Sequence, residues 1–267
     1  MFTSSSRRNS LILTAALILL SAAMYAQDAS KPASLVTADD FNQFTWRWVG
    51  PTTFSGRITA FAVPRGQSQT YYVLTASSGV WKTEDGGTTW REISRGLVPF
   101  KWVSRIVASP HDVDTVYVAL SGYREDDFAP YLFRSADRGE TWTRISYGLP
   151  NEPINVVRED PLVPDLLYVG TDMGVFLSWD AGRTWTVFTG NLPHTPVHDL
   201  QVHPRDREIV LGTHGRSVFV ANVSLIQQLT ADVRAKPVHV FLNEADVIFG
   251  IGCSFSTTNY GQQMPAG

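Results

Sequence analysis

Short runs of apolar, aromatic and β-branched residues alternate along this chain with polar stretches that contain Gly, Asp or Pro. Such runs are too short for typical helices and have the residue types that favour strands. They recur in one order: an apolar strand, a turn with Pro, a strand with a Tyr-Val pair, and a hairpin. In the clearest copies Tyr117 and Tyr168 each follow a proline by seven residues. The pattern predicts β-sheet units that repeat every ~40–50 residues.

One eight-residue pattern, Ser/Thr-x-Asp-x-Gly-x-Thr-Trp, occurs at residues 83–90, 135–142 and 178–185. We call each copy a repeat turn. Its Asp can accept hydrogen bonds from the turn's own N–H groups, and its Gly can adopt a positive φ. Its Trp is large enough to pack the hairpin onto a neighbour. A structural role is therefore predicted for Asp85, Gly87, Trp90, Asp137, Gly139, Trp142, Asp180, Gly182 and Trp185.

Four units begin near Arg57, Val103, Ile154 and Val197, and the last unit lacks a repeat turn. Residues 45–48 align with the strand that follows a repeat turn in the other units. We therefore predict an all-β fold, a β-propeller of about four four-stranded blades. We further expect residues 45–49 to complete the last blade, which would close the ring and remove two exposed sheet edges.

The repeat turn resembles the Asp-box, or BNR repeat, of sialidases, sortilin-type receptor domains and secreted bacterial propellers. Residues 48–51, 56–59 and 78–83 look like the opening blade of the sortilin/VPS10-like BNR group. Its final blades are similar to residues 126–131, 157–161, 196–200 and 212–217. The resemblance implies a propeller over residues 45–229. Because members of that group usually carry more blades between the first and the last three, it also implies a shortened member.

The chain ends differ in composition from the repeats. Residues 1–26 combine two arginines, a short apolar run and small residues before Ala26, which predicts a secretory signal peptide and a secreted or periplasmic protein. The apolar run is too short for a membrane span, so no stable span is expected after cleavage. Residues 27–44 read as a disordered leader, and residues 230–267 as a largely irregular C-terminal extension.

Charge and motifs exclude several functions. Without residues 1–26, 20 basic and 25 acidic residues remain, with no basic stripe, so nucleic acid is not expected as a partner. There is no phosphate-binding loop, no nucleophile elbow and no cysteine-pair zinc pattern. The prolines at 193 and 196 keep His194 and His198 off a common helix face. The sequence therefore predicts neither a metal site nor a cofactor.

A glycoside hydrolase would need two carboxylates on either side of the scissile bond. Outside the repeat turns, the candidates for such catalysis are Asp172, Asp199, Glu159 and Asp160, and nothing in their spacing selects a pair. Arg57 lies in Gly-Arg-Ile-Thr, which only partly matches the Phe/Tyr-Arg-Ile-Pro motif of sialidases. Sialidase activity is therefore the weaker form of the enzymatic interpretation.

Binding requires fewer coincidences, because propellers present loops of all blades on common rims. We interpret the protein as a binding or scaffold module for a protein or glycan ligand. The alternative is a glycoside hydrolase, a xyloglucanase- or sialidase-like BNR enzyme, or the inactive remnant of one. An assembly factor similar to the photosystem-assembly BNR propellers fits less well, because no concentrated arginine patch is visible. The candidate ligand-binding residues are Arg57, Arg105, Asp126, Asp127, His198, His214 and Arg216.

Overall fold

A computed structural model describes residues 41–42, 44–47, 49–50, 57–76, 78–188 and 190–236. The chain divides into two compact units, Met1–Trp48 and Val49–Gly267. The expected signal peptide, most of the leader and residues 237–267 lie outside the described residues. None of the helices in the described ranges is both long and apolar enough to cross a membrane.

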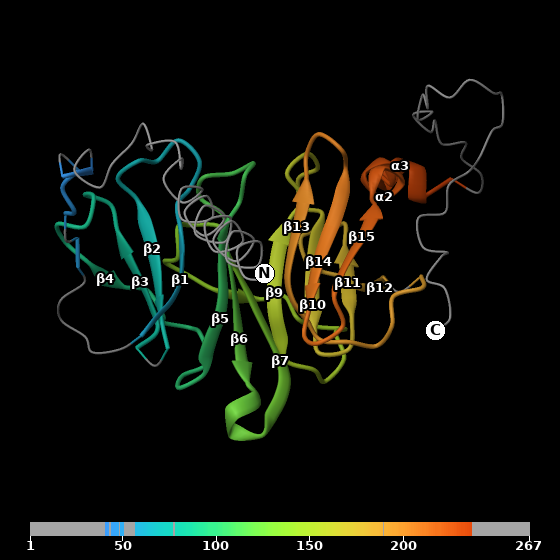
Figure 1. Cartoon of the computed structure of the whole chain (residues 1–267), viewed down its shortest axis with the longest axis horizontal. Coiled ribbons are helices and arrows are strands. Elements are labelled where there is room, and N and C mark those ends of the chain that lie inside the picture. Colours follow the sequence, from blue (N-terminus) through green and yellow to red (C-terminus); the bar gives the residue numbers. More distant parts are fainter. Residues whose placement is uncertain are drawn as a thin grey trace, which may run out of the picture. The chain divides into compact units, whose positions relative to one another are not determined.

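The second unit contains four antiparallel sheets, each built from strands that are consecutive in the chain. This arrangement confirms the predicted all-β propeller with four blades (Figure 1). Two short helices, α2 (Ser224–Gln228) and α3 (Ala231–Arg234), follow the last blade. The strands are β1 (Ile58–Ala62), β2 (Tyr71–Thr75), β3 (Val80–Thr83) and β4 (Arg91–Glu92); β5 (Trp102–Ala108), β6 (Val116–Gly122), β7 (Asp127–Ser135) and β8 (Thr143–Arg144); β9 (Ile154–Glu159), β10 (Leu167–Thr171), β11 (Val175–Ser178) and β12 (Thr186–Phe188); and β13 (Val197–His203), β14 (Glu208–Thr213) and β15 (Val218–Asn222).

The first strand of each blade is its inner strand, and consecutive inner strands pack together, β1 on β5, β5 on β9 and β9 on β13. The hydrophobic core lies between blades. Successive side chains of a strand point to opposite faces of its sheet, so Val118 packs toward the first blade and Tyr117 toward the third. A third apolar cluster, which includes Tyr168 and Leu200, joins the last two blades.

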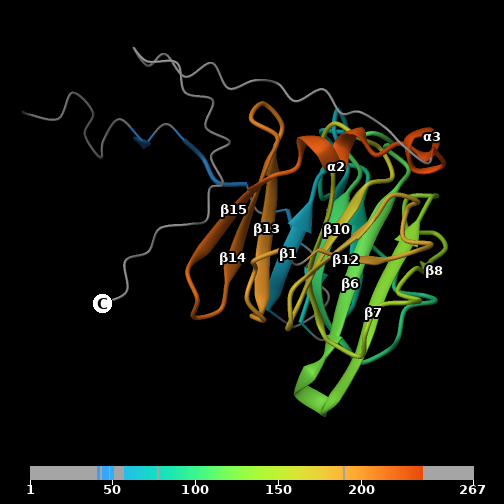
Figure 2. The same cartoon turned by 90° about the vertical axis from the view of Figure 1, so that its right-hand side faces the viewer.

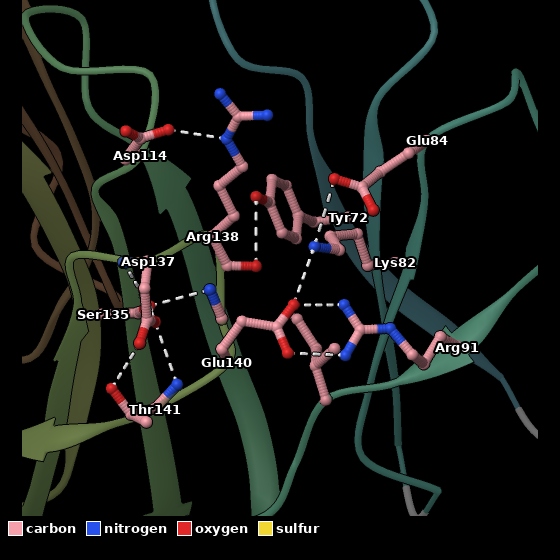
Figure 3. A network of polar contacts seen from close by, with 12 residues as sticks. Tyr72, Lys82, Glu84, Arg91, Asp114, Ser135, Asp137, Arg138, Glu140 and Thr141 are labelled. Carbon is pink, nitrogen blue, oxygen red and sulfur yellow. Dashed lines mark hydrogen bonds and ion pairs between the residues drawn. The ribbon is translucent and has the colours of Figure 1, made fainter.

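The repeat turns adopt the predicted geometry, as the second copy shows in Figure 3. Asp137 Oδ1 accepts hydrogen bonds from the Ser135 hydroxyl at 2.7 Å and the Thr141 N–H at 2.9 Å. Ser135 Oγ in turn accepts the Gly139 N–H at 2.7 Å. The first and third repeat turns repeat this pattern around Asp85 and Asp180.

Each repeat turn packs on the blade before it. The Trp142 indole N–H donates to the Ile93 carbonyl at 2.7 Å, and the Trp185 indole donates to the Ile145 carbonyl at 2.8 Å. Gly139 lies against Ile93 and Gly182 against Ile145, with no room for a side chain. Trp142 and Trp185 therefore act between blades and not only inside their own hairpins. In the first repeat turn, Trp90 and Gly87 make the same contacts with Val49, which precedes the first blade.

The closing strand expected at residues 45–49 is not seen among the described residues, which leave out residue 48. Residues 44–47 lie in no strand, and the last blade has three strands in the described chain. The Val49 carbonyl instead accepts the Trp90 indole N–H at 2.8 Å, the position that Ile93 and Ile145 hold at the later repeat turns. Ile93 and Ile145 directly follow the outer strands β4 and β8, so Val49 occupies the corresponding place before the first blade, but no described residue pairs with β15 as a fourth strand.

We predict that Gly182→Ala destabilises the protein more than Gly148→Ala. Both glycines have φ near +90°, at +87° and +90°, so both substitutions strain the backbone alike. Only at Gly182 would the new Cβ meet a neighbour, at 3.0 Å from Ile145 Cβ. The expected difference in unfolding free energy is about 1–3 kcal/mol, measured by urea denaturation. Equal losses in both variants would contradict the packing role of the turn glycine.

We also predict that the repeat turns weaken in acid. Burial raises the pKa of Asp137, but hydrogen bonds from Ser135 and Thr141 outweigh it and lower that pKa to about 2. Hydrogen bonds from Thr89 and Thr83 lower the pKa of Asp85 to about 2 as well. A carboxyl whose folded pKa is depressed stabilises the fold above its ordinary pKa of 3.8, and this stabilisation is lost as the pH falls toward 2.

The measurement is the thermal unfolding midpoint of Asp137→Asn and of the original protein between pH 6 and pH 2. The variant should be less stable at pH 6, and the two proteins should converge at pH 2. Asp126→Asn changes an exposed aspartate outside the repeat turns and should leave the midpoint unchanged throughout. A deficit of Asp137→Asn that stays constant down to pH 2 would show that the carboxylate charge is not what matters.

Candidate functional site

All four inner strands have a β-bulge at equivalent positions. The pairing register shifts next to Ile58 in β1, Val103 in β5, Ile154 in β9 and Val197 in β13. Such bulges bend a strand and re-aim the side chains that follow. The residues at the bulges are Thr59, Ser104, Asn155 and His198.

Two of the bulge residues also join neighbouring blades. The Thr59 hydroxyl donates to the Val103 carbonyl at 3.3 Å, and the Ser104 hydroxyl donates to the Ile154 carbonyl at 2.9 Å. Each bond runs from the bulge residue of one inner strand to the residue just before the bulge of the next. These two hydrogen bonds therefore fix how the first three inner strands are offset along their axes. The positions of the polar side chains of the site depend on that offset.

Three inner strands contribute to one ionic contact. Asp199 on β13 accepts hydrogen bonds at Oδ1 from Arg105 Nη2 on β5 at 3.1 Å and from Arg158 Nη2 on β9 at 3.3 Å. The same oxygen accepts the Leu200 N–H at 3.0 Å. Side chains from the second, third and fourth blades thus meet at a single carboxylate oxygen.

The two arginines are held mainly by the protein itself. Arg105 also donates to the His198 carbonyl at 3.3 Å, and Arg158 Nε donates to the Leu200 carbonyl at 3.1 Å. Arg105 Nε is buried and has no hydrogen-bond partner in the described chain. Burial, followed by repulsion from Arg105, lowers the pKa of Arg158, and Asp199 opposes the shift. Two guanidiniums against one carboxylate leave this contact with excess positive charge.

Two histidines lie beside this contact. The rings of His198 and His214 have centroids 5.1 Å apart and are tilted by 37°. Both residues are exposed. The main-chain N–H of His214 donates to the Pro196 carbonyl at 2.9 Å. We call the five residues around this contact the inner-strand cluster: Arg105, Arg158, His198, Asp199 and His214.

The structure thus brings together four residues that the sequence had proposed separately. The arginine that joins them, Arg158, was missed. A signal for it existed, because Arg158 lies on an inner strand that also contains the buried residues Ile154, Val156 and Val157. A charged residue on such a strand needs a partner across the inner face, and the sequence does not say which one.

Asp160, proposed as a candidate for catalysis, is completely buried and fully used inside the protein. Its Oδ1 accepts the N–H groups of Leu162 and Val163, and its Oδ2 accepts the Tyr168 hydroxyl at 2.8 Å and Gln227 Nε2 at 2.9 Å. These bonds tie α2 to the third blade. The Asp160 carboxylate therefore has a structural role.

The other two carboxylates proposed for catalysis, Glu159 and Asp172, form no hydrogen bond or ion pair with the inner-strand cluster in the described structure. Glu159 is buried, which raises its pKa, and its Oε1 accepts the Asp165 N–H at 3.1 Å. Asp172 accepts a hydrogen bond from Asn155 Nδ2 at 2.8 Å, just after β10. No contact in the described structure joins Glu159, Asp172 and Asp199 to one another.

The long β6–β7 hairpin holds a second group of the proposed binding residues. It extends beyond the neighbouring strands, with η3 (Tyr123–Glu125) at its tip (Figure 2). Asp127 pairs with Lys101 at 2.7 Å and accepts the Tyr131 hydroxyl, which lowers the pKa of Asp127 to about 2. Asp126 is exposed beside it with a left-handed φ of 54°.

Arg57 belongs to this group and not to the inner-strand cluster. Its guanidinium lies 4.8 Å from the centre of the Trp102 ring, and that of Arg124 lies 4.2 Å from it. Arg216 is exposed in the turn between β14 and β15. Among the residues with described positions, no three His, Cys, Asp or Glu side chains are placed to hold a metal ion.

No family model matches the chain, and no curated protein matches it. Among solved structures, the GH74 xyloglucanase from Xanthomonas campestris matches with a TM-score of 0.50 and 19% identity, over 62% of this chain and 29% of that one. An ancestral GH74 enzyme matches with a TM-score of 0.49 and 20% identity, over 59% and 22%. YCF48 bound to D1 peptide matches with a TM-score of 0.48 and 15% identity, over 63% and 52%.

This chain therefore spans less than a third of the length of the two enzymes. The identities are too low for the similarity to carry an activity or a ligand. The match to the xyloglucanase supports the β-propeller fold, in agreement with the strand order.

We predict that Asp199→Asn lowers the unfolding free energy by about 1 kcal/mol at low salt, because two arginines then repel each other without a counter-charge. The loss should shrink in high salt, which screens like charges. Asp206→Asn is the control, since Asp206 pairs with an Arg205 side chain that is 81% exposed, and it should change stability little. Equal effects of both variants in urea denaturation would contradict a coupling across three blades.

Proposed function

We propose that this protein is a secreted or periplasmic binding module of the sortilin/VPS10-like BNR group, which recognises a protein or glycan ligand. The ligand would contact the inner-strand cluster and the β6–β7 hairpin. One observation carries the proposal: the one exposed carboxylate of the cluster, Asp199, is bound by Arg105 and Arg158.

This pairing favours binding over hydrolysis. A glycoside hydrolase needs one carboxyl group that protonates the leaving oxygen and a second one across the bond. Asp199 serves as a counter-ion for two guanidiniums, and Asp160 is enclosed in four internal hydrogen bonds. Within the inner-strand cluster, the groups that remain open to a ligand are arginine N–H donors and the two histidine rings.

The hairpin supplies apolar contact area in a fixed shape. Tyr123 and Phe128 are 60% and 41% exposed, and their rings pack edge to face with centroids 6.0 Å apart. Arg124 on Trp102 and Lys101 on Asp127 attach the hairpin to β5 and the segment before it. Aromatic side chains that are already positioned lose little entropy when a ligand binds.

The resemblance of the repeat turns to the Asp-box, with the signal-like residues 1–26, supports the assignment to the secreted BNR group. In such propellers the turns serve folding, which agrees with their packing between blades. The recognition surface is then left to the parts of the blades that differ from one another. Both the inner-strand cluster and the hairpin are of that kind.

The test is a glycan array and a polysaccharide panel probed with the purified protein, with binding and release of reducing sugar read in parallel. We expect binding without release. Tyr123→Ala and His198→Ala should each weaken binding roughly tenfold, as loss of a good contact does. Arg65→Ala, an exposed change in the first blade, should have no effect. Sugar release that disappears in Asp172→Asn or Asp199→Asn would overturn the proposal in favour of a hydrolase.

A further inference from the structure

A cavity of about 450 Å³ lies between the outer strands of the second blade and the third repeat turn. Arg134 on β7 and Arg183 in the repeat turn line it. Arg144 on β8 also contributes to the lining, but it pairs with Phe133, so its side chain lies on the other face of the sheet, with the guanidinium over Tyr131. None of its lining residues in the described chain is an aspartate or glutamate. The cavity therefore gathers the positive charges of Arg134 and Arg183, and it lies outside the inner-strand cluster.

The equivalent place between the first and second blades has its charges neutralised (Figure 3). Lys82, buried on β3, lies 3.3 Å from Glu140 of the second repeat turn and 3.3 Å from Glu84. Arg91 on β4 also binds Glu140, with Nη1 2.7 Å from Oε2. Two cations and two carboxylates thus form a closed network between these blades.

Strand pairing fixes which residues correspond. Lys82 pairs with Arg91 across β3 and β4, and Arg134 pairs with Thr143 across β7 and β8. Arg134 therefore occupies the position of Lys82. Within the repeat turns, Arg183 takes the position of Glu140, and Ala136 takes that of Glu84. Both carboxylates of the first network are missing in the second, and one of them is replaced by a cation.

Arg134 and Arg183 form no ion pair in the part of the chain that is described. Hydrogen bonds from Asp114 and Thr115, and then the charge of Arg134, lower the pKa of Asp112, but the oxygens of that carboxylate are already used by Asp114 and Thr115. Arg134 Nε is buried without a hydrogen-bond partner, and its Nη2 donates to the Thr115 hydroxyl at 3.3 Å. Arg144 donates to the Ser146 hydroxyl and the Pro130 carbonyl, which are neutral. The adjacent aspartates are used inside their own repeat turns.

We propose that this cavity is a binding site for an oxyanion, a carboxylate, sulfate or phosphate group carried by a ligand, which supplies the charge that Glu140 provides between the first two blades. Guanidinium groups match such oxygens with two parallel N–H donors. Thr143 and Tyr147, both exposed on the lining, add hydroxyl groups. The ligand would bridge two blades, as Glu140 does.

The deciding variant is Arg183→Glu, which rebuilds the first network in the second interface. Isothermal titration calorimetry at fixed ionic strength would use sodium sulfate, sodium phosphate and sodium glucuronate as probes, so that tetrahedral anions and a carboxylate are distinguished. We expect the original protein to bind at least one of them and Arg183→Glu to bind it at least about tenfold more weakly. Arg183→Glu should also unfold at the same or a higher temperature.

Arg65→Glu is the matched control, because it changes the net charge equally at an exposed site in the first blade. Its affinity should equal that of the original protein. Failure of all three probes to bind the original protein would overturn the proposal, as would equal weakening by both variants. If Arg183→Glu does not fold, Arg183→Gln replaces it, and unchanged affinity in that variant would also overturn the proposal.

Discussion

The contact on which the other parts of this structure depend is the packing of each repeat turn on the end of the preceding blade. The tryptophan indole of the turn donates to a main-chain carbonyl, and the glycine of the turn leaves room for the side chain of the residue that bears this carbonyl. At this glycine an added Cβ would clash with that residue, so the hydrogen bond and the close packing together fix the position and the direction of the turn on its neighbour. Because the turn's aspartate accepts hydrogen bonds from the turn's own donors, the indole N–H finds its acceptor outside the turn.

The spacing set by these contacts decides what the inner strands can do. Bulges at equivalent positions and the hydroxyl bonds of Thr59 and Ser104 hold adjacent inner strands in register. Only with that register can Arg105, Arg158 and Asp199 meet, because they come from three blades. The repeated backbone thus brings the cluster together, although the residues of the cluster differ from blade to blade.

The same logic applies between the outer parts of the blades. One backbone arrangement presents Lys82, Arg91 and Glu140 in one interface and Arg134, Thr143 and Arg183 in the next. The backbone needs no change to convert a neutralised network into a cationic cavity, because the residues concerned lie at variable positions of the repeat. A propeller can therefore place separate recognition sites on one scaffold.

The sequence by itself determined the strands, the repeat and the structural role of the turns, because hydrogen bonds within eight residues and a period of two are local properties. It also identified Arg105, His198, Asp199 and His214 one by one. Only the tertiary structure decided that Arg105 and Arg158 meet at Asp199 and that Asp160 is a buried anchor for α2. These outcomes depend on contacts between residues about 40 to 94 positions apart, which no local pattern in the chain encodes.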